Sequence, residues 1–346
     1  MAGLGSVQQK IPCVYETTVL NEPSKKRSYQ QYNVVATNTV RQIAKQESID
    51  TAVATEKLDG TCVFISEFQG KPWLWARLDR KPNKAAEKRF KKFQTQRRQG
   101  KGDADDLAST ENSEVSFPWE VPSDFKEVPE HWIPASGVPI SNGQPQPDAN
   151  GHIPGWVPVD PKSRQHCWHL TAVDLTHSIG LVLREKTDEG RKLQVDLVNL
   201  SELLGKTAEL IGTHVNGNPY GIGNKATPLH LMVLHGSIKA TVPCGLHLEE
   251  VRAWLEGNNS GRMEGVVWHC ESGSLYKLHR HHVNLPWPMK DPTLSQRPVS
   301  ITVDITPYEV EENNTSCLWT LSKLNGQTCD SLPAMVRVLD MLSSHS

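Results

Sequence analysis

The stretch Glu56-Lys57-Leu58-Asp59-Gly60-Thr61 contains the pattern Lys-x-Asp-Gly, in which a lysine amine can act as a nucleophile. A free lysine amine has a pKa of about 10.4, so it needs burial or a second cation to become neutral and reactive near pH 7. The tetrad alone would arise by chance in a chain of this length about one time in ten. Its meaning therefore depends on the residues around it.

Residues 61–68 alternate and contain β-branched and aromatic side chains, which predicts a strand directly after the tetrad. Lys57 is therefore expected on a loop that leads into a strand. The same patterns predict further strands at residues 13–20, 32–37, 73–78, 168–174, 179–184, 193–198, 229–234 and 265–269. Helical spacing predicts helices at residues 201–212, 246–254 and 332–342.

The charges are unevenly distributed along the chain. Residues 71–101 hold twelve Lys and Arg against two acidic residues, an excess of +10, whereas residues 103–130 have a net charge of −8. Pro82 and Asn83 start a predicted basic helix with an apolar ridge at Ala86, Phe90 and Phe93. Such a helix attracts a polyanion, although a merely solvated helix face is the alternative.

The composition is that of an ordinary globular protein, with 346 residues, 37% hydrophobic and 22% charged, and a net charge of −2. No apolar run reaches the roughly 18 residues that span a bilayer, and no secretory signal precedes the first strand. We therefore expect an intracellular protein, cytoplasmic with a nuclear or mitochondrial pool left open. The seven cysteines lack Cys-x-x-Cys spacing, and the His/Cys clusters at 166–169 and 269–282 lack zinc-site spacing, so reduced thiols are expected.

Four residues downstream supply what a nucleophilic lysine would need. Lys277 is a candidate second cation that would lower the pKa of Lys57 and bind an α-phosphate. Glu264 precedes a glycine and a buried strand, where a carboxylate would hold a divalent cation. Glu209 can accept hydrogen bonds from ribose, and Arg77 ends a strand twenty residues beyond Lys57. Each could instead be an ordinary surface charge.

This order of motifs resembles the covalent nucleotidyltransferase superfamily, which comprises ATP-dependent DNA ligases, RNA ligases and mRNA capping enzymes. The Glu-Lys pair and the Lys57 to Arg77 spacing are similar to the bacteriophage RNA ligases of the second type. Two features depart from the pattern. His279 stands where the second lysine of the Lys-x-Lys motif is usual, and the aromatic residue that usually stacks on adenine is missing from residues 229–235.

Longer strings resemble the vertebrate 5′-to-3′ RNA ligases, at residues 75–84, 151–159, 209–213, 216–221 and 267–270. The resemblance extends to about residue 298 and weakens after it. It implies ATP-dependent, Mg²⁺- or Mn²⁺-dependent joining of RNA 5′-phosphate and 3′-hydroxyl ends through a lysine-AMP intermediate, in RNA repair. A monomer is expected, and a catalytically inactive RNA-binding protein that keeps the fold is the alternative.

The resemblance also implies roles for individual residues. Lys57 would accept AMP, with Lys277 and Glu264 as the other catalytic residues and Glu264 as the metal ligand. The residues expected to bind the nucleotide are Glu56, Asp59, Gly60, Arg77, Glu209 and His279. The residues expected to contact RNA are Arg80, Lys81, Lys84, Lys88 and Arg280.

The implied fold is α+β, an ATP-grasp-like nucleotidyltransferase (adenylation) domain with two antiparallel sheets flanking a nucleotide cleft. This domain would span residues 1–298, with a flexible insertion at 99–117 and an ordered but irregular Pro/Gly/Trp-rich segment at 118–161. Residues 299–346 would form a partly helical extension. Only 69 residues follow Lys277, so no complete oligonucleotide-binding barrel, a module of about 80 to 100 residues, is expected.

Overall fold

The computed structural model describes residues 4, 6–24, 30–99, 117–186, 191–257, 259–308 and 317–344. The contacts divide the chain into a first unit, Met1–Val7, Ile11–Ala76 and Val159–Ser346, and a second unit, Gln8–Lys10 and Arg77–Pro158. The predicted extension at 299–346 belongs to the first unit. In the part of the chain described, no helix combines the length and apolarity needed to cross a membrane.

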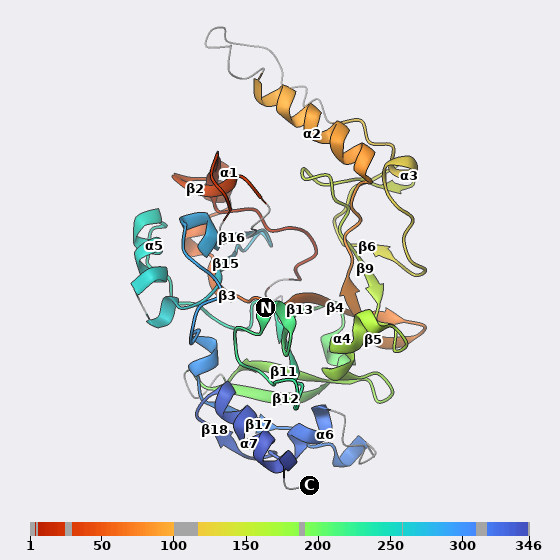
Figure 1. Ribbon diagram of the computed structural model, residues 1–346, viewed down its shortest axis with the longest axis vertical. Helices are drawn as coiled ribbons and strands as arrows, with labels where there is room; N and C mark the ends of the chain where they lie inside the picture. Colours follow the sequence, from red (N-terminus) through yellow and green to blue (C-terminus); the bar gives the residue numbers. More distant parts are fainter. Residues whose placement is uncertain are drawn as a thin grey trace. The chain divides into compact units, whose positions relative to one another are not determined.

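A large mixed sheet dominates the first unit (Figure 1). Its strands follow the order β18 (Thr328–Cys329), β17 (Val299–Thr302), β12 (Leu193–Asn199), β11 (Ile179–Glu185), β14 (His230–Leu234), β13 (Thr207–Gly212), β4 (Thr61–Phe68) and β5 (Lys71–Arg77). The short β10 (Val173–Asp174) pairs with β11. β11 is parallel to β14 and β12 is parallel to β17, so the prediction of purely antiparallel sheets is wrong for these pairs.

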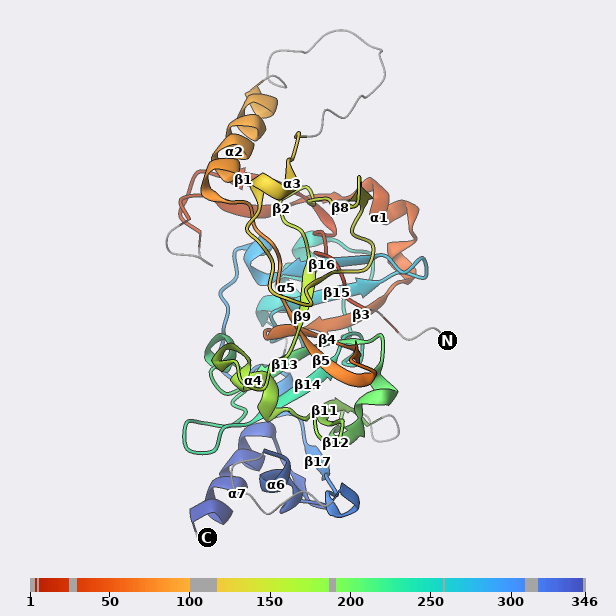
Figure 2. The same cartoon turned by 90° about the vertical axis from the view of Figure 1, so that its right-hand side faces the viewer.

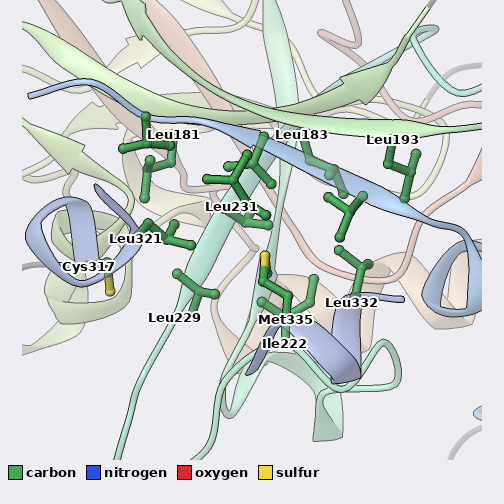
Figure 3. Close-up of a cluster of buried hydrophobic side chains, with 14 of the residues drawn as sticks. Leu181, Leu183, Leu193, Ile222, Leu229, Leu231, Cys317, Leu321, Leu332 and Met335 are labelled. Carbon is green, nitrogen blue, oxygen red and sulfur yellow. The ribbon is translucent and has the colours of Figure 1, made fainter. Parts of the chain in front are cut away.

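One face of this sheet packs against the two C-terminal helices, α6 (Cys317–Ser322) and α7 (Leu332–Ser344) (Figure 2). Leu181 and Leu231 from the sheet meet Leu332 and Met335 of α7, and all four side chains are fully buried (Figure 3). Each such side chain contributes about 1.5 to 3 kcal/mol of hydrophobic stabilisation. The C-terminal residues therefore complete the core that fixes β13 and β14.

A second sheet of the first unit has the order β16 (Leu275–His279), β15 (Gly265–His269) and β3 (Val53–Lys57). Its apolar residues Val266 and Leu278 pack with Val251 and Leu255 of α5 (Leu248–Gly257) in a separate hydrophobic cluster. The hairpin of β1 (Tyr15–Leu20) and β2 (Asn33–Val40) and the short α1 (Gln42–Gln46) contribute to the same cluster. The two sheets therefore have different cores.

The second unit contains α2 (Lys84–Gln99), α3 (Val121–Asp124) and the short strands β6 (Ile133–Pro134), β7 (Ile140–Ser141), β8 (Gln144–Pro145) and β9 (Gly155–Pro158). The predicted helix start is confirmed, because Asn83 Oδ1 accepts a hydrogen bond from Ala86 N at 3.0 Å. Phe90 packs against the rings of Phe117 and Trp119, as the predicted apolar ridge requires. The predicted insertion at 99–117 lies outside the described residues except at its ends.

Three predictions of secondary structure are wrong. Lys57 is the last residue of strand β3 rather than part of a loop, because it pairs with Gly265 of β15. Residues 201–212 form a 3-10 turn followed by strand β13, because Gly205 adopts φ 78° and β13 then pairs on both sides, with β4 and β14. Pairing on two sides outweighs the local helical spacing. Residues 168–174 form mostly α4 (Cys167–Thr171), where Thr171 Oγ1 donates to the carbonyl of Trp168 at 2.8 Å. The remaining predicted strands and helices are present with shifted ends.

Candidate active site

Lys57 ends β3, at the edge of the three-stranded sheet. Its Cα is in register with Gly265 of β15, which in turn pairs with His279 of β16. Residues paired across neighbouring strands present their side chains to the same face. Lys277, two residues from His279, lies on this face as well. The sheet therefore brings the amine, the imidazole and the second lysine to one side.

Glu264, immediately before β15, joins the amine to the imidazole. Lys57 Nζ donates to Glu264 Oε2 at 2.6 Å, and His279 Nε2 lies 2.5 Å from Glu264 Oε1. His279 Nδ1 accepts from the backbone N–H of His281, so the proton of the neutral ring is on Nε2 and is donated to Glu264. Both carboxylate oxygens are thus engaged.

The electrostatics of this trio set a definite resting state. Burial alone would raise the pKa of Glu264, but Lys57 and His279 lower it to about 2. Burial would likewise lower the pKa of Lys57, yet the opposing charges of Glu264, Glu209 and Asp59 raise it above its usual value. The prediction that Lys277 lowers the pKa of Lys57 is therefore wrong for the resting site. Lys57 rests as an ammonium paired with a carboxylate.

Two glycines allow the close approaches in this site. A Cβ on Gly265 would meet the carbonyl oxygen of Leu278 at 2.1 Å. A Cβ on Gly60 would lie 2.4 Å from the carbonyl oxygen of Leu210 and 2.8 Å from Cγ of Glu209. All three distances are shorter than real Cβ contacts. Gly60 therefore lets the loop after Lys57 lie directly against β13.

The side chain of Asp59 holds that loop in place. Asp59 Oδ1 accepts from Asn216 Nδ2 and Asp59 Oδ2 accepts from Trp287 Nε1, both at 2.7 Å. Asn216 also donates to the carbonyl of Gly60, and the Tyr220 hydroxyl accepts from the N–H of Asp59 at 2.9 Å. The sequence interpretation assigned no role to Asn216, Tyr220 or Trp287. Nothing in their local pattern indicates contact with Asp59, which lies at least 157 positions away along the chain.

Glu56 is buried with a solvent exposure of 7%, beside Lys57 in sequence. Burial, together with the charges of Glu185 and Glu264, raises its pKa to about 8 against the lowering effect of Arg297. Near pH 7 this side chain is therefore mainly a neutral acid, and its buried Oε1 lacks a hydrogen-bond partner among the described residues.

Glu209 lies on β13 rather than on a helix, and the cause is the strand pairing described above. Its Cα is in register with Cys62 of β4. Glu209 Oε2 lies 3.1 Å from Nε2 of His235, and the two side chains are 15% and 17% exposed. Glu209 is thus a partly accessible carboxylate next to the Lys57 loop.

Lys277 is fixed through its backbone. Its N–H donates to the carbonyl of Pro12 and its carbonyl accepts from Val14, each at 2.9 Å. These bonds add the segment before β1 to the outer edge of the three-stranded sheet. The position of Lys277, two strands from Lys57, is therefore set by main-chain hydrogen bonds.

Arg77 begins the second unit, and its contacts described here belong to that unit. Its guanidinium donates to Asp79 Oδ1 at 2.5 Å and to the carbonyl of Gln8 at 2.6 Å, and lies 4.7 Å from the ring centroid of Trp156. The three groups orient the arginine rigidly.

The predicted RNA contacts differ in accessibility. Arg280 is only 3% exposed and donates to the carbonyls of Leu255, Gly261 and Pro286, which argues against a contact with RNA. Arg80 packs over Phe125 and Trp132 and donates to the carbonyl of Lys126. By contrast, the basic side chains at the start of α2 and just before it are exposed, namely those of Lys81, Lys84 and Lys88.

Comparisons with known proteins agree with this arrangement of motifs. A family model described as RNA ligase 1 matches residues 1–337. The chain is 46% identical over 332 residues to RNA ligase 1 of Rattus norvegicus, with 96% of this chain and 98% of that protein covered. RNA ligase 1 of Danio rerio is 45% identical over 332 residues, with the same shares covered. RNA ligase 1 of Pongo abelii is 47% identical over 305 residues, covering 88% of this chain and 90% of that protein.

Proposed function

The chain belongs to the RNA ligase 1 family, and from this premise we propose that it joins RNA 5′-phosphate and 3′-hydroxyl ends with ATP. The observation that carries the proposal is the contact of Lys57 with Glu264 at 2.6 Å, backed by His279. A lysine amine beside a carboxylate in one partly exposed site is suited to attack on a nucleotide, and His279 orients that carboxylate.

In the first step, the neutral Lys57 amine forms a bond to the α-phosphorus of ATP, and the bond to the pyrophosphate oxygen breaks. The ammonium must first lose a proton, and Glu264 Oε2 is the acceptor already in contact with it. Because the pKa of Glu264 is about 2, this transfer is unfavourable at rest. The resting ion pair therefore suppresses reaction until substrate binding changes the charges around Lys57.

In the second step, an oxygen of the RNA 5′-phosphate attacks the phosphorus of lysine-AMP and the bond to Lys57 breaks. In the third step, the RNA 3′-hydroxyl loses its proton and attacks the activated 5′-phosphorus, and AMP leaves. Lys57 is regenerated, so one lysine serves each cycle.

The nucleotide would lie between the three-stranded sheet, which carries Lys57, and the large sheet, which carries Glu209. Neutral Glu56 would present an O–H donor and a carbonyl acceptor, which match N1 and the N6 amino group of adenine. Glu209 would accept hydrogen bonds from ribose hydroxyls. Lys277 would bind phosphate oxygens, and the phosphate contact predicted for Arg77 stays a prediction.

A hard cation would bind at Glu264, the carboxylate in contact with Lys57. Glu264, Glu209 and Asp59 all act electrostatically on Lys57, and carboxylate oxygens are the ligands that Mg²⁺ and Mn²⁺ prefer. Bound there, Mg²⁺ or Mn²⁺ would supply neutralisation of phosphate charge. Glu264 is the central member of this set because it touches the nucleophile itself.

RNA would be attracted by exposed lysines of α2. Lys84, Lys88 and Lys92 recur every four residues and are exposed, so they form a stripe along one side of the helix. Among the described residues, no ion pair involves these three lysines. Their charges are therefore available to neutralise backbone phosphates.

The experiment that tests the proposal is incubation of the purified chain with α-labelled ATP and Mg²⁺ or Mn²⁺. We expect one acid-stable AMP per chain, its loss in Lys57→Ala, and its retention in Lys162→Ala, a control at an exposed lysine. Transfer of the label to 5′-phosphorylated RNA and sealing of nicked or free strands should follow. A chain that binds RNA but never acquires AMP would instead support an inactive RNA-binding protein.

A further inference from the structure

Three metal-binding side chains come from adjacent strands of the large sheet. Cys62 on β4 is in register with Glu209 on β13, and Glu209 is in register with Val233 on β14. His235 lies two residues beyond Val233 and continues the pairing, because its N–H donates to the carbonyl of Thr207. By the alternation of strands, the three side chains lie on the same face. Their closeness is built into the register of the sheet.

The donor atoms of these three residues are close enough to share one ion. The sulfur, the carboxylate oxygen and the imidazole nitrogen all lie within 4.8 Å of one another. Zinc bonds of about 2.0 to 2.3 Å place tetrahedral ligands about 3.3 to 3.8 Å apart. The Glu209 Oε2 to His235 Nε2 separation is already 3.1 Å. Small side-chain adjustments therefore suffice.

The imidazole is also oriented as metal-bound histidines usually are. His235 Nδ1 lies 2.7 Å from Thr207 Oγ1, which accepts the N–H of Val7 at 2.7 Å. A hydroxyl oxygen has two lone pairs, so Thr207 can also accept from Nδ1–H. A metal on Nε2 would then take the place of the proton in the present hydrogen bond from Nε2 to Glu209 Oε2. Thr207 is only 1% exposed, which makes it a rigid support.

One of the three proposed ligands, His235, borders a cavity. A cavity of about 380 Å³ is lined in part by Thr207, His235 and Gly236. Cys62 is half-buried, and the side chains of Glu209 and His235 keep about one sixth of their surface exposed. The ligands are thus shielded from bulk water without being sealed from an incoming ion.

We propose that Cys62, Glu209 and His235 form a site for a borderline-soft divalent cation, Zn²⁺ in the first place. Sulfur and nitrogen donors select zinc over magnesium, which prefers an all-oxygen shell. The metal would displace the thiol proton of Cys62 and bind as a thiolate complex. Three protein ligands leave one position of a tetrahedral ion open, as in exchangeable rather than purely structural zinc sites.

The site adjoins the Lys57 loop through Glu209. Gly60 approaches Glu209 so closely that a Cβ there would be 2.8 Å from its Cγ. One carboxylate would then serve two ligands, the zinc ion and the ribose. Bound zinc should therefore slow formation of lysine-AMP, a consequence that rests on the proposed function.

Cobalt titration of the full-length, metal-free protein tests the site without any assay of activity. We expect one equivalent of Co²⁺ to give a thiolate-to-cobalt charge-transfer band and intense tetrahedral d–d bands, both displaced by Zn²⁺. Cys62→Ser should abolish the charge-transfer band and weaken binding more than about tenfold. Cys244→Ser, at an exposed thiol elsewhere in the first unit, is the matched control and should keep both.

His235→Gln provides a second, independent ligand deletion, with circular dichroism to verify folding. A cobalt complex without the thiolate band, or equal affinity in wild type and Cys62→Ser, overturns the assignment. The inhibitory effect is measured separately as the zinc-dependent fall in AMP labelling, which should be smaller in Cys62→Ser. If no AMP labelling occurs at all but the cobalt bands appear, the proposed function fails and the metal site stands.

Discussion

The two units of the molecule handle charge in opposite ways. Around Lys57 in the first unit, charges are buried and compensated, with Glu264 only 4% exposed and both of its oxygens engaged. On α2 in the second unit, the lysines at 84, 88 and 92 are exposed and form no ion pair with described residues. Buried, paired charges govern a chemical step, whereas exposed charges govern encounter with a polyanion. Changes in the two regions should therefore affect different measurements.

The largest effect should come from Glu264→Gln. It removes the proton acceptor of Lys57 and the central metal ligand, so we expect AMP transfer to Lys57 to fall about a hundredfold or more. Equilibrium binding of RNA should change far less, and a filter-binding assay on the same preparation checks this. Faster labelling in the variant would mean that Glu264 merely restrains Lys57.

A smaller loss is expected for His279→Ala. The imidazole orients Glu264 through its contact with Oε1. Removal of such a supporting contact typically lowers activity about ten- to a hundredfold. The measurement is the single-turnover rate of AMP labelling at saturating ATP. His279→Lys adds the second lysine of the usual motif, and an active variant would indicate that a cation can replace the imidazole. A fully active His279→Ala would show that the imidazole is not needed for AMP transfer.

The pH dependence of stability separates Glu264 from an ordinary surface carboxylate. Its pKa is about 2 in the folded protein against a usual value of 4.5, so its stabilisation is present above pH 4.5 and is lost as the pH falls toward 2. Between pH 6 and pH 3 the difference in unfolding free energy between wild type and Glu264→Gln should shrink by about 2 kcal/mol. Urea denaturation at both pH values measures it. A difference independent of pH would contradict the buried ion pair.

Glu56 should show the opposite sign. Burial raises its pKa to about 8, so its contribution to stability is greatest below pH 4.5 and falls as the pH rises toward 8. Glu56→Gln should therefore become more stable relative to wild type between pH 5 and pH 8, by about 3.5 kcal/mol. The same denaturation series includes this variant. A constant difference across that range would show that Glu56 is ionised in the folded protein.

The smallest effect per residue belongs to the second unit. Replacement of Lys84, Lys88 and Lys92 with Ala should lower RNA affinity about tenfold and reduce the salt dependence of binding, by about 0.7 in log–log slope for each phosphate that the variant no longer neutralises. Formation of lysine-AMP, which needs no RNA, should fall much less. Equal losses in both assays would abolish the contrast between the two units.

The sequence sufficed for the chemical centre because its residues lie in short contiguous motifs. Lys57 and Glu264-Gly265 could be picked out by local pattern, and the structure brings them into contact. Glu209 was identified, but its strand was predicted as a helix, since local spacing cannot reveal pairing on two sides. Support of Asp59 by Asn216 and Trp287 depends on long-range folding and has no local signature.

The cluster of Cys62, Glu209 and His235 shows this limit most clearly. A search for zinc sites by spacing favours ligands a few residues apart, as in the His/Cys clusters at 166–169 and 269–282. Here Cys62 lies more than a hundred residues before Glu209 and His235 along the chain. Only the register of the strands brings the three side chains close together. Register depends on the folded sheet as a whole.

Gly265 sets a limit on how this protein can vary. Even one methyl group at that position would overlap the main chain of the neighbouring strand. Residue 265 therefore determines how close β15 lies to β3 and β16, whose residues Lys57 and His279 both contact Glu264. A saturation library at codon 265, selected for joining of RNA, should return the parental amino acid alone. The smallest side chain in the region is thus the one with the least freedom to change.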